Sequence, residues 1–411
     1  MNFLTNRSIL KDSNFFLFWL SHVISSMGNT LIPVTITFAV LEVTGSATKL
    51  GVVLGALWIS RVLFVMFGGV LADRLSRKKI LIISDLLQGV NHLIIGILFF
   101  VGSIEMWHLI VSSVLYGAVS AFHSPASSGI IPQLTSKENY QKANSVLSIM
   151  SNIFEIAGPA LAGLMVVFLG FSTIFFIDAL TFFLSLILML FVKERFKKES
   201  QAQESYWTDL VEGIKVTRNY SWIWSTLIIF SVLNFATAAF YVLGPIVISE
   251  NYGGPKVWGF IVTAGAIGGL IGALLSHNIK LKNPLRFCFI IMPLFVSIEF
   301  LVLIGPMPSW LIMFAAMLAS ASIVIGAVLW DTIVQKNIPQ NLLSRIGSLD
   351  SFVSFVFMPL GFVLAGPLSD QLGMTMTLII ITSFVVVSSI LILFVGDTLK
   401  IKSGKKYNLE F

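Results

Sequence analysis

Long runs of apolar residues, separated by short polar turns, dominate the chain. Within each run the apolar character continues over about twenty residues and does not alternate with polar positions, which excludes a transmembrane β-barrel. A continuous run of this length predicts an α-helix that crosses a bilayer. We expect twelve such helices, at residues 14–40, 48–72, 79–102, 106–124, 143–169, 172–193, 222–249, 256–278, 285–305, 308–335, 345–370 and 375–396.

Composition supports an all-α integral membrane protein. The chain is 56% hydrophobic and 11% charged, with a mean hydropathy of +0.92, and a soluble protein of this length could not bury so much apolar surface. The single cysteine, Cys288, excludes an internal disulfide and a thiolate metal site. No P-loop, zinc-protease or nucleophile-elbow motif occurs, so we expect no enzyme activity, no cofactor and no bound metal.

The distribution of cations predicts how the chain is oriented. If twelve helices cross the membrane, 23 of the 26 lysines and arginines lie on the side that carries both termini. Cytoplasmic loops are enriched in cations, so both termini are expected in the cytoplasm of a cell-membrane protein. The net charge of +6 therefore reflects topology, and no nucleic-acid partner is expected. The first apolar run is too long for a cleavable signal, so we expect it to be retained as a membrane span.

The longest polar segment divides the predicted spans six and six. We expect an N-terminal bundle at residues 1–193, a cytoplasmic linker with an amphipathic surface segment at 194–220, and a C-terminal bundle at 221–411. The two halves also share similar short stretches. Ile131-Pro132-Gln133 corresponds to Ile338-Pro339-Gln340, and Gly158-x-x-x-Ala162-Gly163 corresponds to Gly361-x-x-x-Ala365-Gly366. This repeat predicts two similar six-helix halves about a central pathway.

A short charged turn separates the second and third apolar runs and reads Gly69-Val70-Leu71-Ala72-Asp73-Arg74-Leu75-Ser76-Arg77-Lys78-Lys79. A turn this short must join two antiparallel helices, and its four cations against one anion favour the cytoplasm. The pattern resembles the loop between helices 2 and 3 of the major facilitator superfamily, except that Ser76 replaces the family's second glycine.

Further stretches resemble one branch of that superfamily, which holds macrolide efflux proteins and enterobactin-type siderophore exporters. They are Ala121-Phe122-His123-Ser124-Pro125-Ala126, Ala143-Asn144-Ser145, Gly158-Pro159-Ala160-Leu161-Ala162-Gly163 and Asp178-Ala179-Leu180. The resemblance implies the major facilitator fold, with two pseudo-symmetric six-helix bundles that alternate access to a central site. It also implies a cytoplasmic gate that includes Gly69, Asp73, Arg74 and Arg77, with Asp73 at the positive end of helix 11.

Two acidic residues of helices 3 and 11, Asp85 and Asp350, lie at equivalent depths near this gate. We interpret both as gate structure, with Asp85 as a charge partner of the nearby cation cluster.

In the fifth predicted helix, Gly158, Pro159 and Gly163 resemble a motif of the exporters of this superfamily. The alternative is that these residues only form a packing face, on which small residues let helices approach closely.

Ionisable residues midway along a membrane helix are costly, so each one needs a partner or a function. Arg61 and Glu155 lie midway along the second and fifth predicted helices, and opposite charge at similar depth makes a buried pair plausible. Glu155 then either carries a coupling proton or contacts a cationic substrate, or forms a static ion pair with Arg61. Many proton-coupled exporters have an arginine midway along helix 4, where this chain has Tyr116, and Arg61 is the candidate substitute.

Other polar side chains of the spans are candidates for substrate contact, although each could instead bond to a neighbouring helix. Asp331 could attract a cationic substrate near the inner end of helix 10. Asp178 and Glu299 are weaker candidates, because helices 6 and 9 usually face outward in this fold. The remaining candidates are His22, Asn29, Tyr116, Asn234 and Tyr241.

The function these observations predict is a secondary exporter of a small organic molecule that works by alternating access, with protons as the expected coupling ion. The substrate is either an amphiphilic drug of the macrolide kind or an endogenous siderophore or metallophore. A proton-coupled importer and a sensor or scaffold that does not transport are the alternatives. We expect the chain to act as a monomer surrounded by lipid, since the pathway lies within one chain.

Overall fold

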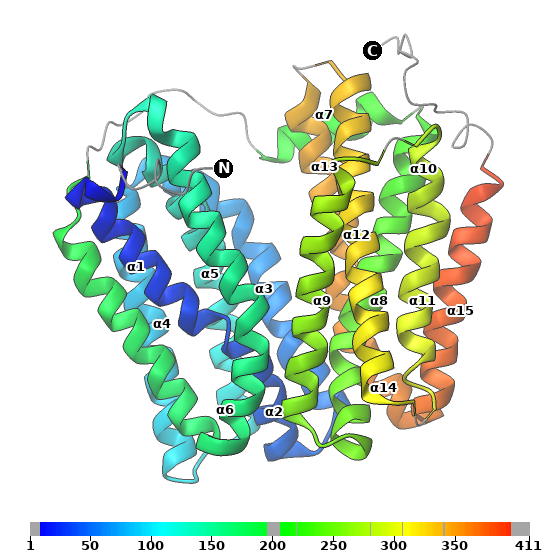
Figure 1. Cartoon of the computed structure of the whole chain (residues 1–411), viewed down its shortest axis with the longest axis horizontal. Coiled ribbons are helices and arrows are strands. Elements are labelled where there is room, and N and C mark those ends of the chain that lie inside the picture. The colour runs from blue at the N-terminus through cyan, green and yellow to red at the C-terminus, as the bar shows by residue number, and fades with distance from the viewer. Residues whose placement is uncertain are drawn as a thin grey trace. The chain divides into compact units, whose positions relative to one another are not determined.

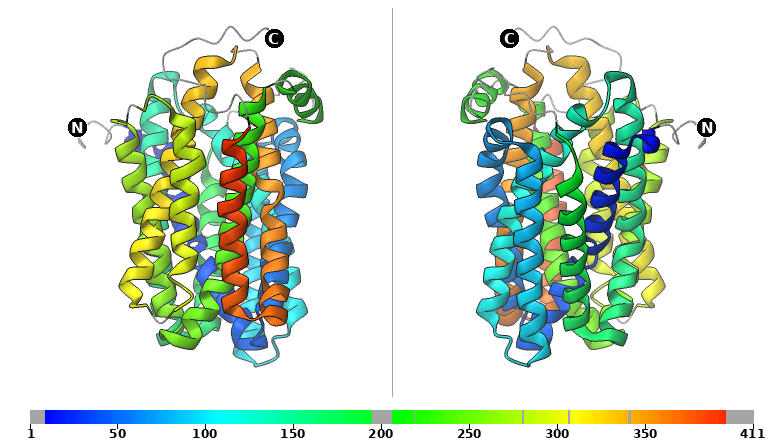
Figure 2. Two further views of the ribbon diagram at one scale, coloured as in Figure 1. Left: turned by 90° about the vertical axis from the view of Figure 1, so that its right-hand side faces the viewer. Right: turned by 90° about the vertical axis from the view of Figure 1, so that its left-hand side faces the viewer.

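A computed structural model describes residues 9–194, 206–218, 220–279, 281–305, 307–339 and 342–395. Within these ranges all regular structure is helical and no strand occurs. The chain divides into two compact units, Met1–Gln201 and Ala202–Phe411. Each unit is a bundle of long helices that run alongside one another, as Figures 1 and 2 show.

In its described residues the first unit contains six α-helices and, besides a 3-10 turn at residues 9–11, the 3-10 segment η2. They are α1 (Ser13–Asn29), α2 (Ile32–Thr44), α3 (Ala47–Arg74), α4 (Arg77–Phe100), α5 (Met106–Leu134), η2 (Lys137–Asn139) and α6 (Tyr140–Phe191). Helices α1 and α2 are two parts of one membrane span, broken at Thr30 and Leu31. Asp12 caps the start of α1, where its carboxylate accepts hydrogen bonds from the backbone of Asn14 and Phe15.

The helix α6 is too long for one span. It and η2 form one apolar segment of 55 residues, which would measure about 80 Å against a hydrocarbon core of about 30 Å. Gly170 interrupts the segment with φ 75° and ψ 170°, a conformation that only glycine adopts readily. Eleven helical segments of the described residues are long and apolar enough to cross a membrane, and this break makes one of them two spans. The expectation of twelve spans therefore holds.

The second unit has the same order of spans after a surface helix. Its helices are α7 (Tyr206–Thr217), α8 (Ser221–Asn251), α9 (Pro255–Ser276), α10 (Pro284–Arg286), η3 (Phe287–Ile291), α11 (Met292–Leu301), α12 (Ser309–Asn337), α13 (Leu343–Val356), α14 (Met358–Leu372) and α15 (Met374–Leu393). The π-helical segment η3 links α10 to α11 within one span, and α13 and α14 together form another. Helix α7 packs on α13, where Arg345 Nε and Glu212 Oε2 lie 2.6 Å apart.

The two units repeat the same internal packing. In the first, α3 packs on α5 and α1 on α6; in the second, the equivalent spans α9 and α12, and α8 and α14, pack on each other. Gly373 separates the last two spans with φ 83° and ψ 156°, and lies twelve residues after Gly361, as Gly170 does after Gly158. The repeat predicted from the sequence therefore extends to backbone conformation, and the two bundles are pseudo-symmetric.

The predicted end of the fourth span is wrong. The sequence predicts an end at residue 124, but α5 continues past Pro125 and Pro132 to Leu134. Both prolines lie inside the helix, which membrane helices tolerate when neighbouring groups satisfy the freed carbonyls.

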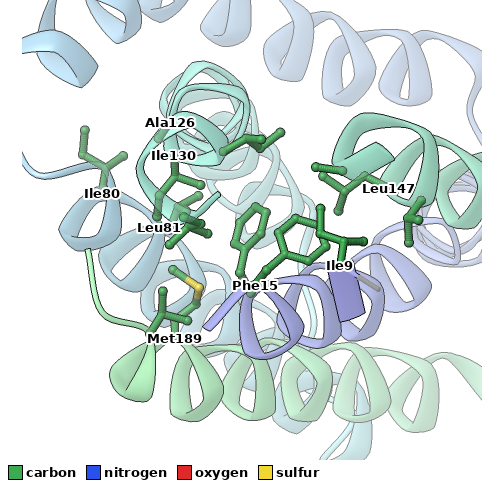
Figure 3. Packing of buried hydrophobic residues seen from close by; sticks show 14 residues of the cluster. Ile9, Phe15, Ile80, Leu81, Ala126, Ile130, Leu147 and Met189 are labelled. Atoms are coloured by element: carbon green, nitrogen blue, oxygen red, sulfur yellow. The ribbon is translucent and has the colours of Figure 1, made fainter. Parts of the chain in front are cut away.

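An apolar cluster fixes one end of the first unit. Phe15 and Phe18 of α1 pack against residues of α4, α5 and α6, among them Leu81, Ile130 and Met189 (Figure 3). All five are almost fully buried. The cluster holds the ends of α4 and α6 together beside the turn between the second and third spans.

Candidate functional site

The most deeply buried polar contact of the first unit joins His92 of α4 to Asp178 of α6. His92 Nδ1 and Asp178 Oδ2 form a hydrogen bond, and the two residues are 1% and 0% exposed. The rings of Phe175 and Phe182 lie 5.7 and 6.0 Å from the imidazole and exclude water from it. A carboxylate so deeply buried needs such a partner, because an unpaired charge in an apolar environment is very costly.

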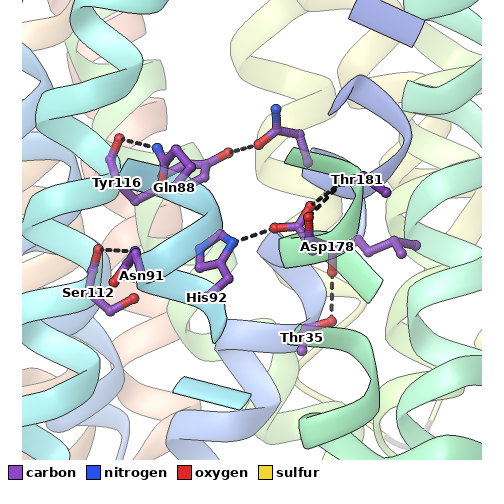
Figure 4. A network of polar contacts seen from close by, with 10 residues as sticks. Thr35, Gln88, Asn91, His92, Ser112, Tyr116, Asp178 and Thr181 are labelled. Atoms are coloured by element: carbon purple, nitrogen blue, oxygen red, sulfur yellow. Dashed lines mark hydrogen bonds and ion pairs between the residues drawn. The ribbon is translucent and has the colours of Figure 1, made fainter. Parts of the chain in front are cut away.

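A second pair of side chains extends this contact to two further helices (Figure 4). The ring of Tyr116, on α5, stacks on His92 with 5.7 Å between centroids and 22° between planes. Its hydroxyl donates a hydrogen bond of 3.0 Å to Asn29 Oδ1, in the last residue of α1. Four helices, α1, α4, α5 and α6, therefore meet in one polar network.

The network lies at the break between α1 and α2. Gly28 packs directly against the carboxylate of Asp178 and the hydroxyl of Thr181, and any side chain at position 28 would collide with both. On another part of α6, a side chain at Gly158 would come within 2.5 Å of Thr30. Two glycine contacts therefore flank the break in the first span. Gly28 makes one of them in the polar network, and Gly158 makes the other in the glycine–proline motif of the fifth span. Pro159 and Gly163 of that motif are also buried.

A buried polar stripe runs along α4 from the network toward the Arg77 end of the helix. Its residues recur at helical spacing and are Ser84, Asp85, Gln88, Asn91 and His92. The Ser185 hydroxyl donates to Asp85 Oδ2 at 2.6 Å, and His123 Nε2 lies 4.0 Å from Asp85 Oδ1. Ser185 in turn bonds to Ser21 of α1. Asp85 Oδ1 and Gln88 Oε1 are buried without a hydrogen-bond partner among the described residues.

This arrangement corrects the interpretation of Asp85 as a partner of the loop cations. Of those cations whose side chains the structure describes, Arg77, Lys78 and Lys79, none pairs with Asp85. Arg77 bonds to the Gly129 carbonyl, and Lys78 Nζ donates to the carbonyls of Leu190 and Val192 at 2.8 and 2.7 Å. Lys78 thus binds the carboxyl end of α6, where exposed carbonyls attract positive charge, and Arg77 binds a carbonyl inside α5.

Ser76, which replaces the expected glycine of the loop motif, caps α4. Its hydroxyl oxygen accepts a hydrogen bond from the backbone of Lys79 at 3.2 Å and bonds to the carboxylate of Glu194 after the sixth span. Gly69, Asp73 and Arg74 belong to α3, but their side chains lie outside the described residues. The gate role of these three stays a prediction.

Arg61 and Glu155 do not form the expected buried pair. Both side chains are exposed, and within the described part of the chain no ion pair joins them. The Arg61 guanidinium instead lies over the ring of Trp58, 5.2 Å from its centroid. It also interacts electrostatically with Tyr116, because α3 and α5 cross closely where Gly117 meets the backbone of Leu57 and Arg61. His22 is half-buried and stacks on Phe18.

The candidates of the second unit lie on four spans. Asp350 of α13 accepts hydrogen bonds from the Trp330 indole at 3.0 Å and from Ser354 at 2.7 Å. Asn234 of α8 donates to the carbonyl of Ser354 at 2.9 Å, so these contacts tie α8, α12 and α13 together. Asp331, next to Trp330, is exposed, as is Tyr241 of α8, whereas Glu299 of α11 is buried.

Among the described residues, a hydrogen bond joins two predicted candidates directly in the case of Asn29 and Tyr116. Sequence reasoning missed His92, the residue that links this pair to Asp178. A histidine in the middle of a span has no periodic or motif signal, although its mid-bilayer position alone could have marked it. Asp178 was ranked low because helix 6 was expected to face lipid, yet its carboxylate points into the bundle.

Comparison with known proteins is consistent with this architecture. The family model of the Major Facilitator Superfamily matches residues 18–362. The multidrug efflux pump Tap of Mycolicibacterium fortuitum is 25% identical over 369 residues, which cover 85% of this chain and 88% of Tap. Macrolide efflux protein A of Streptococcus pyogenes is 24% identical over 368 residues, covering 87% of this chain and 90% of that protein.

Solved structures support the fold. The nucleoside transporter NupG superposes with a TM-score of 0.75 at 13% identity, covering 93% of this chain and 99% of NupG. A bacterial homologue of the lysosomal transporter Spinster gives 0.71 at 12% identity, covering 97% and 98%. The resemblance inferred from the loop and helix motifs is confirmed. The chain belongs to the Major Facilitator Superfamily and is a multi-pass membrane transporter, not an enzyme.

Proposed function

We propose that this chain exports amphiphilic, cationic small molecules from the cell by proton antiport and alternating access. The relatives support export, since both Tap and macrolide efflux protein A are named as efflux proteins and match over most of their length. Their identity to this chain is low, so their substrates identify a class of probes for this protein and not its substrate.

The observation that carries the proposal is the exposure of charged side chains midway along the spans. Arg61 and Glu155 are exposed at mid-depth of α3 and α6, where contact with lipid tails would cost several kcal/mol for each. They are therefore proposed to face a water-filled pathway, as the substrate-facing residues of a transporter must.

The sign of the exposed charges favours a cationic drug over a metallophore. Glu155 in the first unit and Asp331 in the second are exposed acids that can pair with a substrate cation. Arg61 is the basic group that a polyanionic siderophore would require, and its guanidinium lies over Trp58. Arg61 keeps the metallophore as a second candidate.

The glycine–proline motif of the fifth span supports export over import. Gly158 packs on Thr30 at the break of the first span, so the motif acts on an element that can bend. We further propose that both termini are cytoplasmic, that the gate uses Gly69, Asp73 and Arg74, and that the chain works as a monomer in the cell membrane.

The test is accumulation in cells from which the gene has been deleted. A panel of macrolides and cationic dyes is measured inside the cells, together with an untargeted survey of metabolites in cells and medium. Retention of a dye or macrolide supports drug export, and a trapped metal-chelating metabolite instead supports the metallophore. Reduced uptake of a solute, with no compound retained, would show an importer and contradict the proposal.

A further inference from the structure

We propose that His92 and Asp178 together hold the proton that drives export, at the break between α1 and α2. This inference rests on the proposed proton antiport, whereas the site itself rests on contacts within the first unit. Neither the family match nor the relatives assign a role to these two residues.

A coupling site must change charge when it takes one proton, and this pair does. With a neutral imidazole the pair carries one negative charge, and after it takes up one proton its net charge is zero. Because both residues are almost fully buried among aromatic rings, little water screens that change. The change is therefore felt strongly by the groups that touch the pair.

Those groups belong to the part of the first span next to the break between α1 and α2. Gly28, the last residue but one of α1, touches the Asp178 carboxylate, and Tyr116 connects the His92 ring to Asn29. Thr30 and Leu31 follow, and they separate α1 from α2. A proton on the pair thus alters contacts at Gly28 and Asn29, the last two residues of α1 before the break, which links the charge state to that part of the span.

The polar stripe of α4 also offers a route for the proton, since it leads from the pair past Gln88 to Asp85. Asp85 Oδ1 and Gln88 Oε1 form no hydrogen bond among the described residues, so both can accept one from water along this route. His123, half-buried on α5, lies at the far end of this stripe.

Every helix around the pair brings other titratable or charged groups that its test must separate. These groups are His22 of α1, the exposed Glu42 of α2, Arg61 of α3, Asp85 of α4, Tyr116 and His123 of α5, and Glu155 of α6. Only Tyr116 of these touches His92 directly. The others can be changed one at a time without removing the pair.

The first experiment detects the proton without any substrate. The purified full chain in lipid nanodiscs is titrated with acid while infrared spectroscopy follows the C=O stretch of protonated carboxyl groups, and 15N NMR follows the five histidines. We expect a buried-carboxyl band that is lost in Asp178→Asn and shifted in His92→Gln. The matched control is Glu105→Gln, at the exposed capping pair of Glu105 and His108, and it should leave the band unchanged.

Persistence of the whole band in Asp178→Asn, or absence from the wild type of both the carboxyl band and a change in the His92 15N resonance, would overturn the inference. If Asp178→Asn fails to fold, the 15N resonance of His92 in the wild-type protein decides whether the pair takes up a proton. That resonance is identified as the one that disappears in His92→Gln. A His92 signal that does not respond in the range where the carboxyl band appears would also overturn it.

The second experiment separates a coupling role from a structural one. Proteoliposomes with an imposed pH gradient are tested with ethidium and erythromycin as probes, both for net transport and for exchange of labelled against unlabelled probe. We expect Asp178→Asn to lose at least tenfold in gradient-driven transport while exchange continues, because exchange needs no net movement of protons. Equal loss of both would make the pair structural.

The two proposals fail in different ways. If the wild type shows the carboxyl band but its transport of every probe ignores the pH gradient, proton antiport is wrong and the pair does not drive export. If gradient-driven transport is normal in Asp178→Asn, the antiporter stands and only the assignment of its proton to this pair is wrong.

Discussion

At the scale of single residues, position 28 shows how closely α1 approaches the buried pair. Gly28 has no room for a side chain, since its neighbours are the Asp178 carboxylate and the Thr181 hydroxyl. The glycine is therefore needed for contact and not for backbone conformation, as it lies within a regular helix.

Replacing this glycine tests the close contact. Gly28→Ala should lower stability by about 1–3 kcal/mol, the usual cost of forcing extra volume into a packed core. Thermal unfolding of the purified protein in nanodiscs measures the loss. Gly269→Ala is the control, because a methyl group there would make an ordinary contact of 3.5 Å with Val324 and should cause no loss. Equal stability of the two variants would show that α1 can shift away from Asp178.

The exposed acid of the fifth span allows a second test at this scale. Glu155→Gln should slow the export of a cationic dye about tenfold, since a charge-assisted contact contributes about 1.5 kcal/mol and 1.4 kcal/mol is a factor of ten. Efflux from dye-loaded cells measures the rate, with an uncharged probe as the control. An equal effect on both probes would mean that Glu155 does not recognise positive charge.

The polar residues also show where sequence reasoning ends. Mid-span position alone identified Arg61 and Glu155 as unusual, because the cost of a charge in a bilayer depends on depth. Which residues meet could not be derived, since His92 and Asp178 are 86 positions apart and belong to different helices. The expected pairing of Arg61 with Glu155 failed for the same reason: depth and sign restrict partners but do not fix the direction in which a side chain points.

At the scale of helices, some ends of the membrane spans can be predicted from the sequence and others cannot. Ends marked by a charged turn, such as the start of α4 at Arg77, were predicted to within a few residues. The predicted end of α5 is ten residues too early, and the helix continues through Pro125 and Pro132, which membrane helices tolerate. Breaks inside a span, as at Thr30, leave no hydropathy signal, because the chain stays apolar through them.

Two glycines in equivalent places of the repeat make a matched prediction. Gly170 and Gly373 turn the chain between the last two spans of each half with φ of 75° and 83°. Alanine at either position should lower the free energy of unfolding by about 1–3 kcal/mol, because a residue with a side chain is strained in this backbone conformation. Gly347→Ala, in an open position on α13, should cost nothing. Thermal unfolding of the three variants compares them, and a loss confined to one of the pair would break the symmetry.

At the scale of the whole molecule, the orientation of the chain rests on its cations. The bias toward one side is large, and the loops that carry it alternate with loops that have almost none. The turn between α4 and α5 should therefore lie outside the cell, and η2, between α5 and α6, inside. Ser103 and Lys137 are exposed in these two segments.

Cysteine labelling in living cells tests this orientation, because the native Cys288 is fully buried and contributes little background. A membrane-impermeant maleimide should label Ser103→Cys in intact cells, and Lys137→Cys only after permeabilisation. The reverse pattern would place both termini outside and contradict the predicted topology. An antiporter driven by the inward proton gradient moves its substrate outward in either orientation, so this measurement tests the topology independently of the proposed export.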